Sequence, residues 1–198
     1  MKHLESADVA KLLSDGGTAA ECCRHLAEHC EVCGQRLAGV EALMKRFRHW
    51  DAETVWREGP AADLLFDALL EKGTSPEGRA SLVENDEEYQ TWGLAWVALE
   101  GARKLLAEDA TRAQAWDLAL LAAKIAEHLN ASYHPDSIAD LKALAHATAA
   151  AAGPPGEDSF ATLRQVAAAV TALDQGTGDP AVAQSVTGLL LRAFRGAE

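Results

Sequence analysis

Helical spacing of apolar residues runs through nearly all of the 198 residues, and this pattern constrains the fold more than any other feature. Apolar residues recur at intervals of three and four, and no stretch alternates strictly between apolar and polar residues as a half-buried strand would. Hydrophobic residues make up 48% of the chain, which is enough to bury a substantial core. The sequence therefore predicts an all-α protein.

Five helices of similar length are predicted in the second half of the chain. Their expected starts lie near Glu87, Arg112, Asp136, Ser159 and Pro180. Helices of similar length joined by short breaks are typical of stacked antiparallel hairpins, as in a helical-repeat array. Alternate starts lie further apart than the about 34 residues of a tetratricopeptide repeat, so the period of that repeat is not met.

The first of these five helices, predicted over 87–108, is expected to be the longest, with Asp86 as its N-cap. It carries an apolar stripe suited to the core, formed by Tyr89, Trp92, Trp96, Leu99 and Leu106. Trp116 in the next helix is also expected in the core. Trp50 and Trp56 flank a predicted linker, and the sequence leaves open whether they pack inward or face a partner.

Turn residues divide the first half of the chain into shorter helices. Helices are predicted over 7–15, from Thr18 onward, from about residue 31 to 50, over 60–72, and from Ser75–Pro76 onward. Gly59–Pro60 is expected to break the helix at the end of an N-terminal module. The predicted division is a module over residues 1–59 and a helical-repeat-like domain over residues 60–198.

A cluster of His and Cys residues near the N-terminus carries the main functional signal. His3, His25, Cys30 and Cys33 form the pattern His-x21-His-x4-Cys-x2-Cys. Two thiolates and two imidazoles suit a four-coordinate structural Zn²⁺ site, and four protein ligands leave no position for a catalytic water. A module this small gains folding energy from its metal. In a reducing compartment, Cys clustered near His favours metal binding over disulfides.

Other residues compete for the same ligand positions. His29 stands four residues before Cys33 and is an alternative to His25, and Cys22 and Cys23 lie nearby. An alternative without metal, in which these are buried thiols and surface imidazoles, also stays open. A Cys-x2-Cys pair with two accompanying His residues favours the zinc hypothesis.

Residues 1–40 resemble the zinc-binding anti-sigma-factor domain, in which an early His is followed by His-x3-Cys-x2-Cys in a helical hairpin. The segments MKHLESADVAKLLSD and RHLAEHCEVCGQRL carry this likeness, although four residues rather than three separate His25 from Cys30. The resemblance implies that His3, His25, Cys30 and Cys33 hold structural zinc. It also implies a helical surface that clasps a sigma factor of the extracytoplasmic-function type and blocks its access to RNA polymerase.

Residues 60–198 are similar to bacterial proteins in which tetratricopeptide-like helices follow a zinc-finger-like module. The likeness rests on segments such as VENDEEYQTWGLAWVALEGARKLLAED, ALLAAKIAEHL and ALDQGTGDP. The fold that the two resemblances imply is a small zinc-stabilised helical module followed by an array of antiparallel helical hairpins.

The acidic balance of the chain limits its expected partners. It has 18 Lys+Arg against 30 Asp+Glu, a formal net charge of -12. An acidic surface repels phosphate, so direct binding to nucleic acid is not expected, whereas a partner protein with a basic face, such as a sigma factor, is favoured. No apolar run approaches the roughly 20 residues of a membrane span, and no signal peptide is visible, so the expected location is the cytoplasm, away from membranes.

Catalytic motifs are not evident in the sequence. The segment GTGDP lacks the length and context of a phosphate-binding loop, and His128, His134 and His146 are scattered over separate predicted elements. We therefore expect a regulatory protein-binding protein rather than an enzyme, with no small-molecule substrate.

Two alternatives to the sigma-factor hypothesis stay open. The first is a helical scaffold or adaptor in a larger assembly, including a target or cofactor of a protease or effector enzyme, with purely structural zinc. The second is a redox sensor, in which oxidation of Cys30 and Cys33 ejects zinc and loosens the module.

Overall fold

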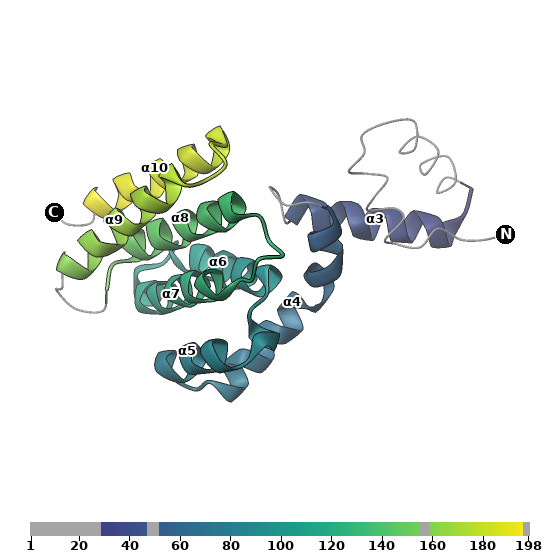
Figure 1. The fold of residues 1–198 in the computed structure, drawn as a ribbon, viewed down its shortest axis with the longest axis horizontal. Helices are drawn as coiled ribbons and strands as arrows, with labels where there is room; N and C mark the ends of the chain where they lie inside the picture. The colour runs from purple at the N-terminus through teal and green to yellow at the C-terminus, as the bar shows by residue number, and fades with distance from the viewer. Residues whose placement is uncertain (1–28, 47–51, 155–158, 196–198) are drawn as a thin grey trace. The chain divides into compact units, whose positions relative to one another are not determined.

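The computed structural model describes residues 29–46, 52–154 and 159–195, and every regular element in these ranges is a helix (Figure 1). The prediction of an all-α fold is confirmed for this part of the chain. The elements are α3 (Glu31–Arg46), α4 (Ala52–Lys72), α5 (Pro76–Asn85), a 3-10 turn (Glu87–Tyr89), α6 (Trp92–Leu105), a second 3-10 turn (Asp109–Thr111), α7 (Arg112–His128), α8 (Pro135–Ala152), α9 (Ser159–Asp174) and α10 (Pro180–Arg195). The helix predicted over 7–15 and the one expected from Thr18 lie outside the described residues.

The chain divides into two compact units, Met1–Ala62 and Asp63–Glu198. The helix break predicted at Gly59–Pro60 is wrong, because α4 continues through both residues to Lys72. Pro60 has no N–H to donate, so this helix lacks one backbone hydrogen bond there. The good helix formers that follow, in the segment AADLLFDALLEK, favour continuation of the helix.

Helix α8 is the centre of the second unit. It packs against α7, α9 and α10, and more lightly against α6. Its sequence DSIADLKALAHATAAAA is apolar on nearly every side, and most of its residues from Ala139 onward are buried. A helix that is apolar all round must be covered on all sides, and its many Ala residues allow neighbouring helices to approach closely.

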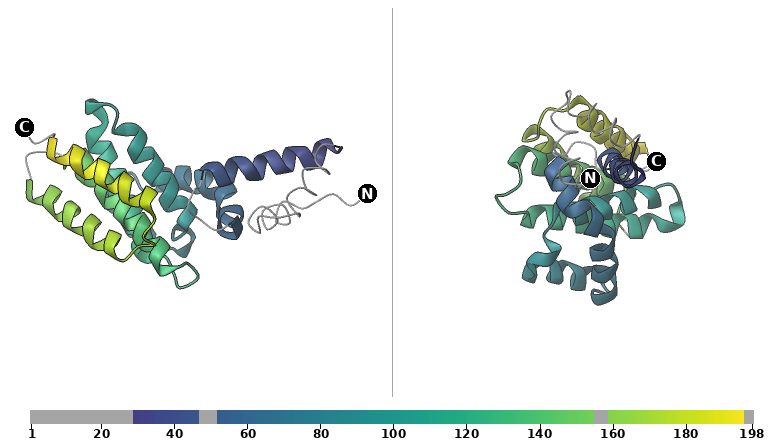
Figure 2. Two further views of the ribbon diagram at one scale, coloured as in Figure 1. Left: turned by 90° about the horizontal axis from the view of Figure 1, so that it is seen from above. Right: turned by 90° about the vertical axis from the view of Figure 1, so that its right-hand side faces the viewer.

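Consecutive helices from α6 to α9 pack in pairs, as expected for helical hairpins (Figure 2). The pattern changes at α10, which packs mainly against α8 and touches α9 little. A regular array would instead place α10 chiefly against α9, the helix before it in sequence. Helices α9 and α10 therefore form a hairpin whose two members both rest on α8.

The predicted apolar stripe of α6 forms part of the core. Trp92, Trp96 and Leu99 are buried, and the ring centroids of Trp92 and Trp96 lie 5.6 Å apart. Trp116 of α7 is buried as well, within a cluster that includes Ala residues of α6 and α8. The core positions predicted for these three Trp residues are confirmed. Trp50 lies outside the described residues.

The predicted helix over 87–108 is wrong in its bounds. The Asp86 carboxylate does accept a hydrogen bond from the N–H of Glu88, at 3.1 Å, but the element it caps is a single 3-10 turn. The 3-10 turn ends at Gln90, and α6 begins after it. Thr91 is the N-cap of α6, because its Oγ1 accepts a hydrogen bond from the N–H of Leu94 at 3.3 Å. The longest helix of the described residues is α4, with 21 residues.

Candidate functional site

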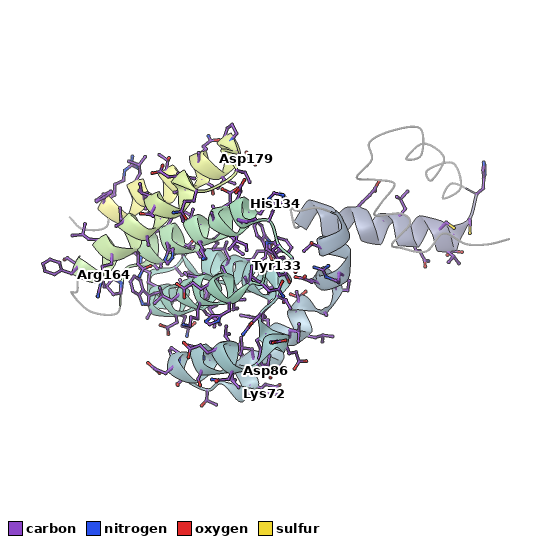
Figure 3. All side chains as sticks on the ribbon, in the orientation of Figure 1. Lys72, Asp86, Tyr133, His134, Arg164 and Asp179 are labelled. Atoms are coloured by element: carbon purple, nitrogen blue, oxygen red, sulfur yellow. The ribbon has the colours of Figure 1, made fainter. Side chains whose placement is uncertain are left out.

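Two of the four predicted zinc ligands lie at the start of α3, in the first unit. The carbonyl oxygen of Cys30 accepts a hydrogen bond from the N–H of Gly34 at 2.9 Å, which begins the helix, and Cys33 lies within its first turn. Cys33 is 6% exposed and Cys30 is half-buried. Residues three apart share one side of a helical turn, and sulfur atoms lie at this end of α3 (Figure 3).

The other predicted ligands, His3 and His25, lie outside the described residues, as do the competing Cys22 and Cys23. His29 lies in the turn before α3 and is exposed. Within residues 29–46, 52–154 and 159–195, no three or more His, Cys, Asp or Glu side chains converge as metal ligands. Two thiols one turn apart at a helix start fit half of a tetrahedral Zn²⁺ site, and the zinc hypothesis stays a prediction.

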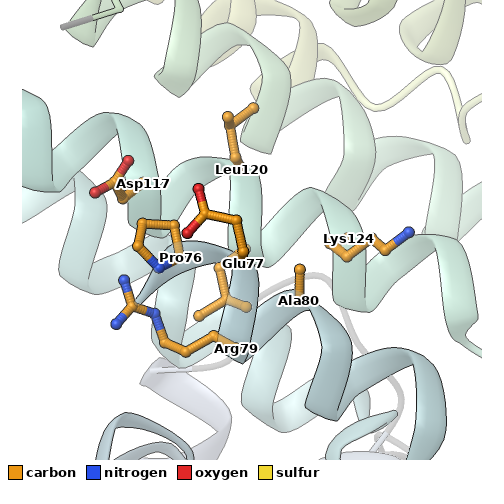
Figure 4. A pocket seen from close by; sticks show the side chains of 8 residues that line it. Pro76, Glu77, Arg79, Ala80, Asp117, Leu120 and Lys124 are labelled. Atoms are coloured by element: carbon orange, nitrogen blue, oxygen red, sulfur yellow. The ribbon is translucent and has the colours of Figure 1, made fainter. Parts of the chain in front are cut away.

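A pocket of about 290 Å³ lies between α5 and α7 in the second unit (Figure 4). Its apolar wall is formed by Pro76, Ala80, Leu120 and Leu121. Charged side chains complete the lining, namely Glu77, Arg79, Asp117 and Lys124. The volume is at the lower end of what holds a small molecule.

The α5 side of this pocket is held by local hydrogen bonds. Helix α5 begins where the sequence predicted, at Ser75–Pro76: Ser75 is its N-cap, and Ser75 Oγ accepts from the N–H of Gly78 at 3.0 Å, with Pro76 at the first helical position. Arg79 donates from Nη1 to the carbonyl of Gly73 at 3.1 Å. Both contacts join α5 to the turn before it, so the pocket wall is set by residues close in sequence.

Two carboxyl groups near the pocket have pKa values shifted in opposite directions. Lys124 Nζ lies 2.6 Å from Glu84 Oε1, and this ion pair lowers the pKa of Glu84 and raises that of Lys124. Burial raises the pKa of Asp117, an effect that nearby Arg79 opposes and Glu77 reinforces. Glu84, whose partner Lys124 lines the pocket, is thus stabilised in its charged form, whereas burial opposes the charged form of the lining residue Asp117.

No Ser, Cys, Thr or His side chain lines the pocket, so its lining offers no hydroxyl, thiol or imidazole group. Sequence reasoning missed the pocket because its residues come from two helices that α6 separates along the chain, and no local motif marks them.

The remaining His residues have separate environments. His134 is the exposed N-cap residue of α8, without a side-chain cap hydrogen bond. His146 Nδ1 lies 2.7 Å from Gln165 Oε1 and links α8 to α9, and His128 is in the last turn of α7. These three side chains are not brought together, in agreement with their predicted scatter.

No protein-family model, curated protein or solved structure matches the chain. The anti-sigma-like module and the tetratricopeptide-like array are therefore not assigned by similarity, and both stay predictions. No helix in the described part of the chain is long and apolar enough to cross a membrane.

Proposed function

We propose that this chain is a regulatory protein-binding protein that sequesters a sigma factor through a zinc-stabilised N-terminal module. Inhibition would be steric, because the module covers a sigma-factor surface that RNA polymerase needs. This role requires no catalytic residue, no nucleic-acid contact and no small-molecule substrate. We expect the protein to act in the cytoplasm, where sigma factors act and where thiols stay reduced.

The observation that carries the proposal is the position of Cys30 directly before α3 and of Cys33 in its first turn. Two thiols held one turn apart by a helix start need little rearrangement to share one tetrahedral ion. His3 and His25 would supply the remaining positions. The zinc would be structural, because four filled positions exclude a substrate water and the binding energy goes into folding the module.

The net charge of -12 supports a basic partner. Complementary charge speeds association and suppresses binding to acidic surfaces. It also works against direct contact with the phosphate backbone of a promoter.

Metal analysis of the purified whole protein tests the zinc premise. We expect about one zinc per chain, lost in Cys33→Ser and in His25→Ala. His134→Ala, an exposed His at the start of α8, is the matched control and should keep its zinc. Cys22→Ser and His29→Ala separate the ligand alternatives. Protein that is purified from zinc-supplemented cells without zinc, or Cys33→Ser protein with full zinc, would contradict the premise.

A reconstituted transcription assay tests the partner. Sigma factors of the native host are purified and mixed with the protein before RNA polymerase is added. We expect one of them to bind and to lose promoter-dependent transcription, with activity restored when Cys33→Ser protein replaces the wild type. Binding to none of them would remove the sigma-factor proposal and leave the scaffold alternative.

The scaffold alternative has an observation of its own. Exposed large apolar residues gather on α9 and α10, far in sequence from the Cys pair. A chain that only sequesters a partner through its first unit has no need of that surface.

A further inference from the structure

The pocket between α5 and α7 has an apolar centre and charged ends. Helix α7 lines it with Asp117, Leu120, Leu121 and Lys124, which follow one another by three, one and three residues. This spacing places the four side chains on one side of the helix. Asp117 and Lys124 lie two turns apart, about 10 Å along the helix axis. Because the two leucines stand between them, the pocket suits an elongated apolar group with a charge at one end.

The positive charge at the Lys124 end of the pocket is already compensated. Lys124 Nζ lies 2.6 Å from Glu84 Oε1 and 3.9 Å from Glu127 Oε2. Figure 4 shows Lys124 away from the other charged side chains of the lining. An anionic ligand would have to compete with both carboxylates for this ammonium group. This end of the pocket therefore does not favour an anion.

The opposite end of the pocket has more negative than positive groups. Asp117 and Glu77 lie there with a single guanidinium, that of Arg79 (Figure 4). Within the described part of the chain, neither carboxylate forms an ion pair or a side-chain hydrogen bond, and Arg79 donates to the carbonyl of Gly73 at 3.1 Å. Burial raises the pKa of Asp117, Arg79 opposes this effect, and Glu77 reinforces it. A cation beside the two carboxylates would offset both their repulsion and the cost of burial.

Glu77 is held in its charged form for a separate reason. It lies in the first turn of α5, where the helix dipole favours a negative charge. Its side chain is exposed, so water reaches this end of the pocket and a charged ligand group need not be fully desolvated. The end at Asp117 and Glu77 thus suits a ligand that enters with its apolar part first and keeps its charge near the surface.

We propose that the α5–α7 pocket binds an alkylammonium group, with its hydrocarbon chain along the apolar wall and its nitrogen at Asp117 and Glu77. The leucines of α7 match the chain, and the two carboxylates match the cation. A pocket of about 290 Å³ suits a short chain, such as that of a lysine side chain of a partner protein or of a small free amine. This site is independent of the zinc-stabilised module, because it uses residues of the second unit alone.

NMR titration of the isotope-labelled full chain tests the site. The first probes are hexylamine, hexanol and hexanoate, which share one apolar chain and differ in the charge of the head group, hexylamine being protonated at neutral pH. We expect the amide signals of Ala80 and Leu121 to shift, with the highest affinity for hexylamine and the lowest for hexanoate. Salt should weaken the binding of hexylamine and not that of hexanol.

A second set of probes represents a partner protein. It consists of a short capped peptide with one central Lys and the same peptide with norleucine, which has the same number of side-chain heavy atoms less the ammonium group, in that place. We expect the Lys peptide to bind more tightly than the norleucine peptide. A higher affinity for hexylamine than for the Lys peptide would assign the pocket to a free amine, and the reverse order would assign it to a lysine of a partner protein.

Matched variants locate the site. Asp117→Asn should weaken hexylamine binding roughly tenfold and leave hexanol binding unchanged, and Glu77→Gln should act in the same direction by a smaller factor because Glu77 is exposed. Ala80→Leu adds apolar volume to the pocket wall and should weaken both ligands. Glu108→Gln makes the same change of charge at an exposed residue outside the pocket, so it should bind as the wild type does. Unchanged circular dichroism will show that the variants fold.

Three results would overturn the proposal. The first is equal affinity for hexylamine and hexanoate, which would mean that the pocket does not select a cation. The second is binding of neither hexylamine nor the Lys peptide. The third is hexylamine affinity that Asp117→Asn leaves unchanged in a folded variant. Cys33→Ser should leave hexylamine binding unchanged, so this test stands apart from the zinc proposal.

Discussion

Asp140 of α8 holds Thr177 of the α9–α10 turn through both of its carboxylate oxygens. The N–H of Thr177 donates to Oδ1 at 3.2 Å, and its hydroxyl donates to Oδ2 at 2.5 Å. The same hydroxyl oxygen accepts from the N–H of Asp179 at 3.2 Å, and Asp179 Oδ1 accepts from the N–H of Ala181 at 2.8 Å. A continuous chain of hydrogen bonds thus runs from the central helix to the first turn of α10.

Asp140→Ala should loosen this turn. Asp140 is 8% exposed, and its removal leaves two donors of Thr177 without their acceptor. Because Thr177 is itself exposed and can turn to water, we expect a loss of about 1–2 kcal/mol in the free energy of unfolding. Urea denaturation measures the loss, and hydrogen exchange at Thr177 and Asp179 should accelerate. Asp174→Ala, an exposed carboxylate beside the same turn, should change stability by no more than about 0.5 kcal/mol.

Gly176→Ala should be destabilising because of the same carboxylate. A Cβ atom on Gly176 would lie 2.0 Å from Asp140 Oδ1, far inside contact distance. In Gly188→Ala, on the exposed side of α10, the added Cβ meets nothing within 4 Å, so we expect a gain of about 0.5–1 kcal/mol from helix propensity. A double-mutant cycle sharpens the test. Gly176→Ala should lower the free energy of unfolding less in the Asp140→Ala background than in the wild type. Equal losses in the two backgrounds would contradict the predicted clash.

The helix starts could be read from the sequence where a local signal marks them. Pro135 and Pro180 begin α8 and α10, and Ser75 caps α5, all within a residue of the predicted starts. Pro60 misled the prediction, because a proline signals a break but does not enforce one when strong helix formers follow. The helix start predicted at Asp86 is wrong for a different reason. Asp86 caps a 3-10 turn, and α6 begins after a second N-cap, Thr91.

Contacts between distant segments could not be read in this way. The packing of α10 on α8 depends on which faces of several helices meet, and apolar spacing does not specify that. Asp140 accepts hydrogen bonds from Thr177, which lies 37 residues further along the chain. The sequence of the GTGDP segment therefore does not indicate which residue holds it. The candidate metal site also has one part that the sequence predicts and another that depends on the tertiary fold. Cys-x2-Cys spacing predicts two thiols on a single helical turn or loop, whereas the contribution of His3 and His25 depends on the tertiary arrangement of the module.

A second link to α10 comes from Arg103 of α6. Its Nη2 donates to Ser185 Oγ at 3.0 Å, and burial lowers the pKa of this guanidinium. Ser185→Ala leaves the buried charge with one acceptor fewer, and we expect a loss of about 1–2 kcal/mol by urea denaturation. Arg103→Met removes the buried charge and keeps most of the side-chain volume, so it should lower the free energy of unfolding less than Ser185→Ala does.

A control for Ser185→Ala is available on the same helix. The hydroxyl of Thr187 bonds only within α10, to the carbonyl of Ala183 at 2.8 Å, and the side chain is exposed. Thr187→Ala should therefore be neutral or slightly stabilising. A loss equal to that of Ser185→Ala would indicate that Ser185 acts through α10 alone rather than through Arg103.

The opposed pKa shifts beside the α5–α7 pocket predict opposite pH effects. Lys124 lowers the pKa of Glu84 below 4.5, so the stability that this ion pair contributes is present above pH 4.5 and is lost as pH falls through the folded-state pKa. We expect Glu84→Gln to be less stable than the wild type at pH 7, with the difference disappearing in acid. Urea denaturation between pH 3 and pH 7 measures this, at low salt because the pair is exposed.

Asp117→Asn should show the reverse. Burial raises the pKa of Asp117 above 3.8, so the folded state takes up a proton at a higher pH than the unfolded chain does. The charged carboxylate therefore costs stability above the folded-state pKa, and this cost disappears as pH falls towards 3.8. We expect Asp117→Asn to be more stable than the wild type at pH 7, by less than about 1 kcal/mol because solvent screens this partly exposed group. The advantage should vanish in acid, where wild-type Asp117 is neutral as well. An Asp117→Asn variant that is less stable at pH 7 would contradict this prediction, because favourable interactions of the charged carboxylate, such as the one with Arg79, would then outweigh the cost of its burial.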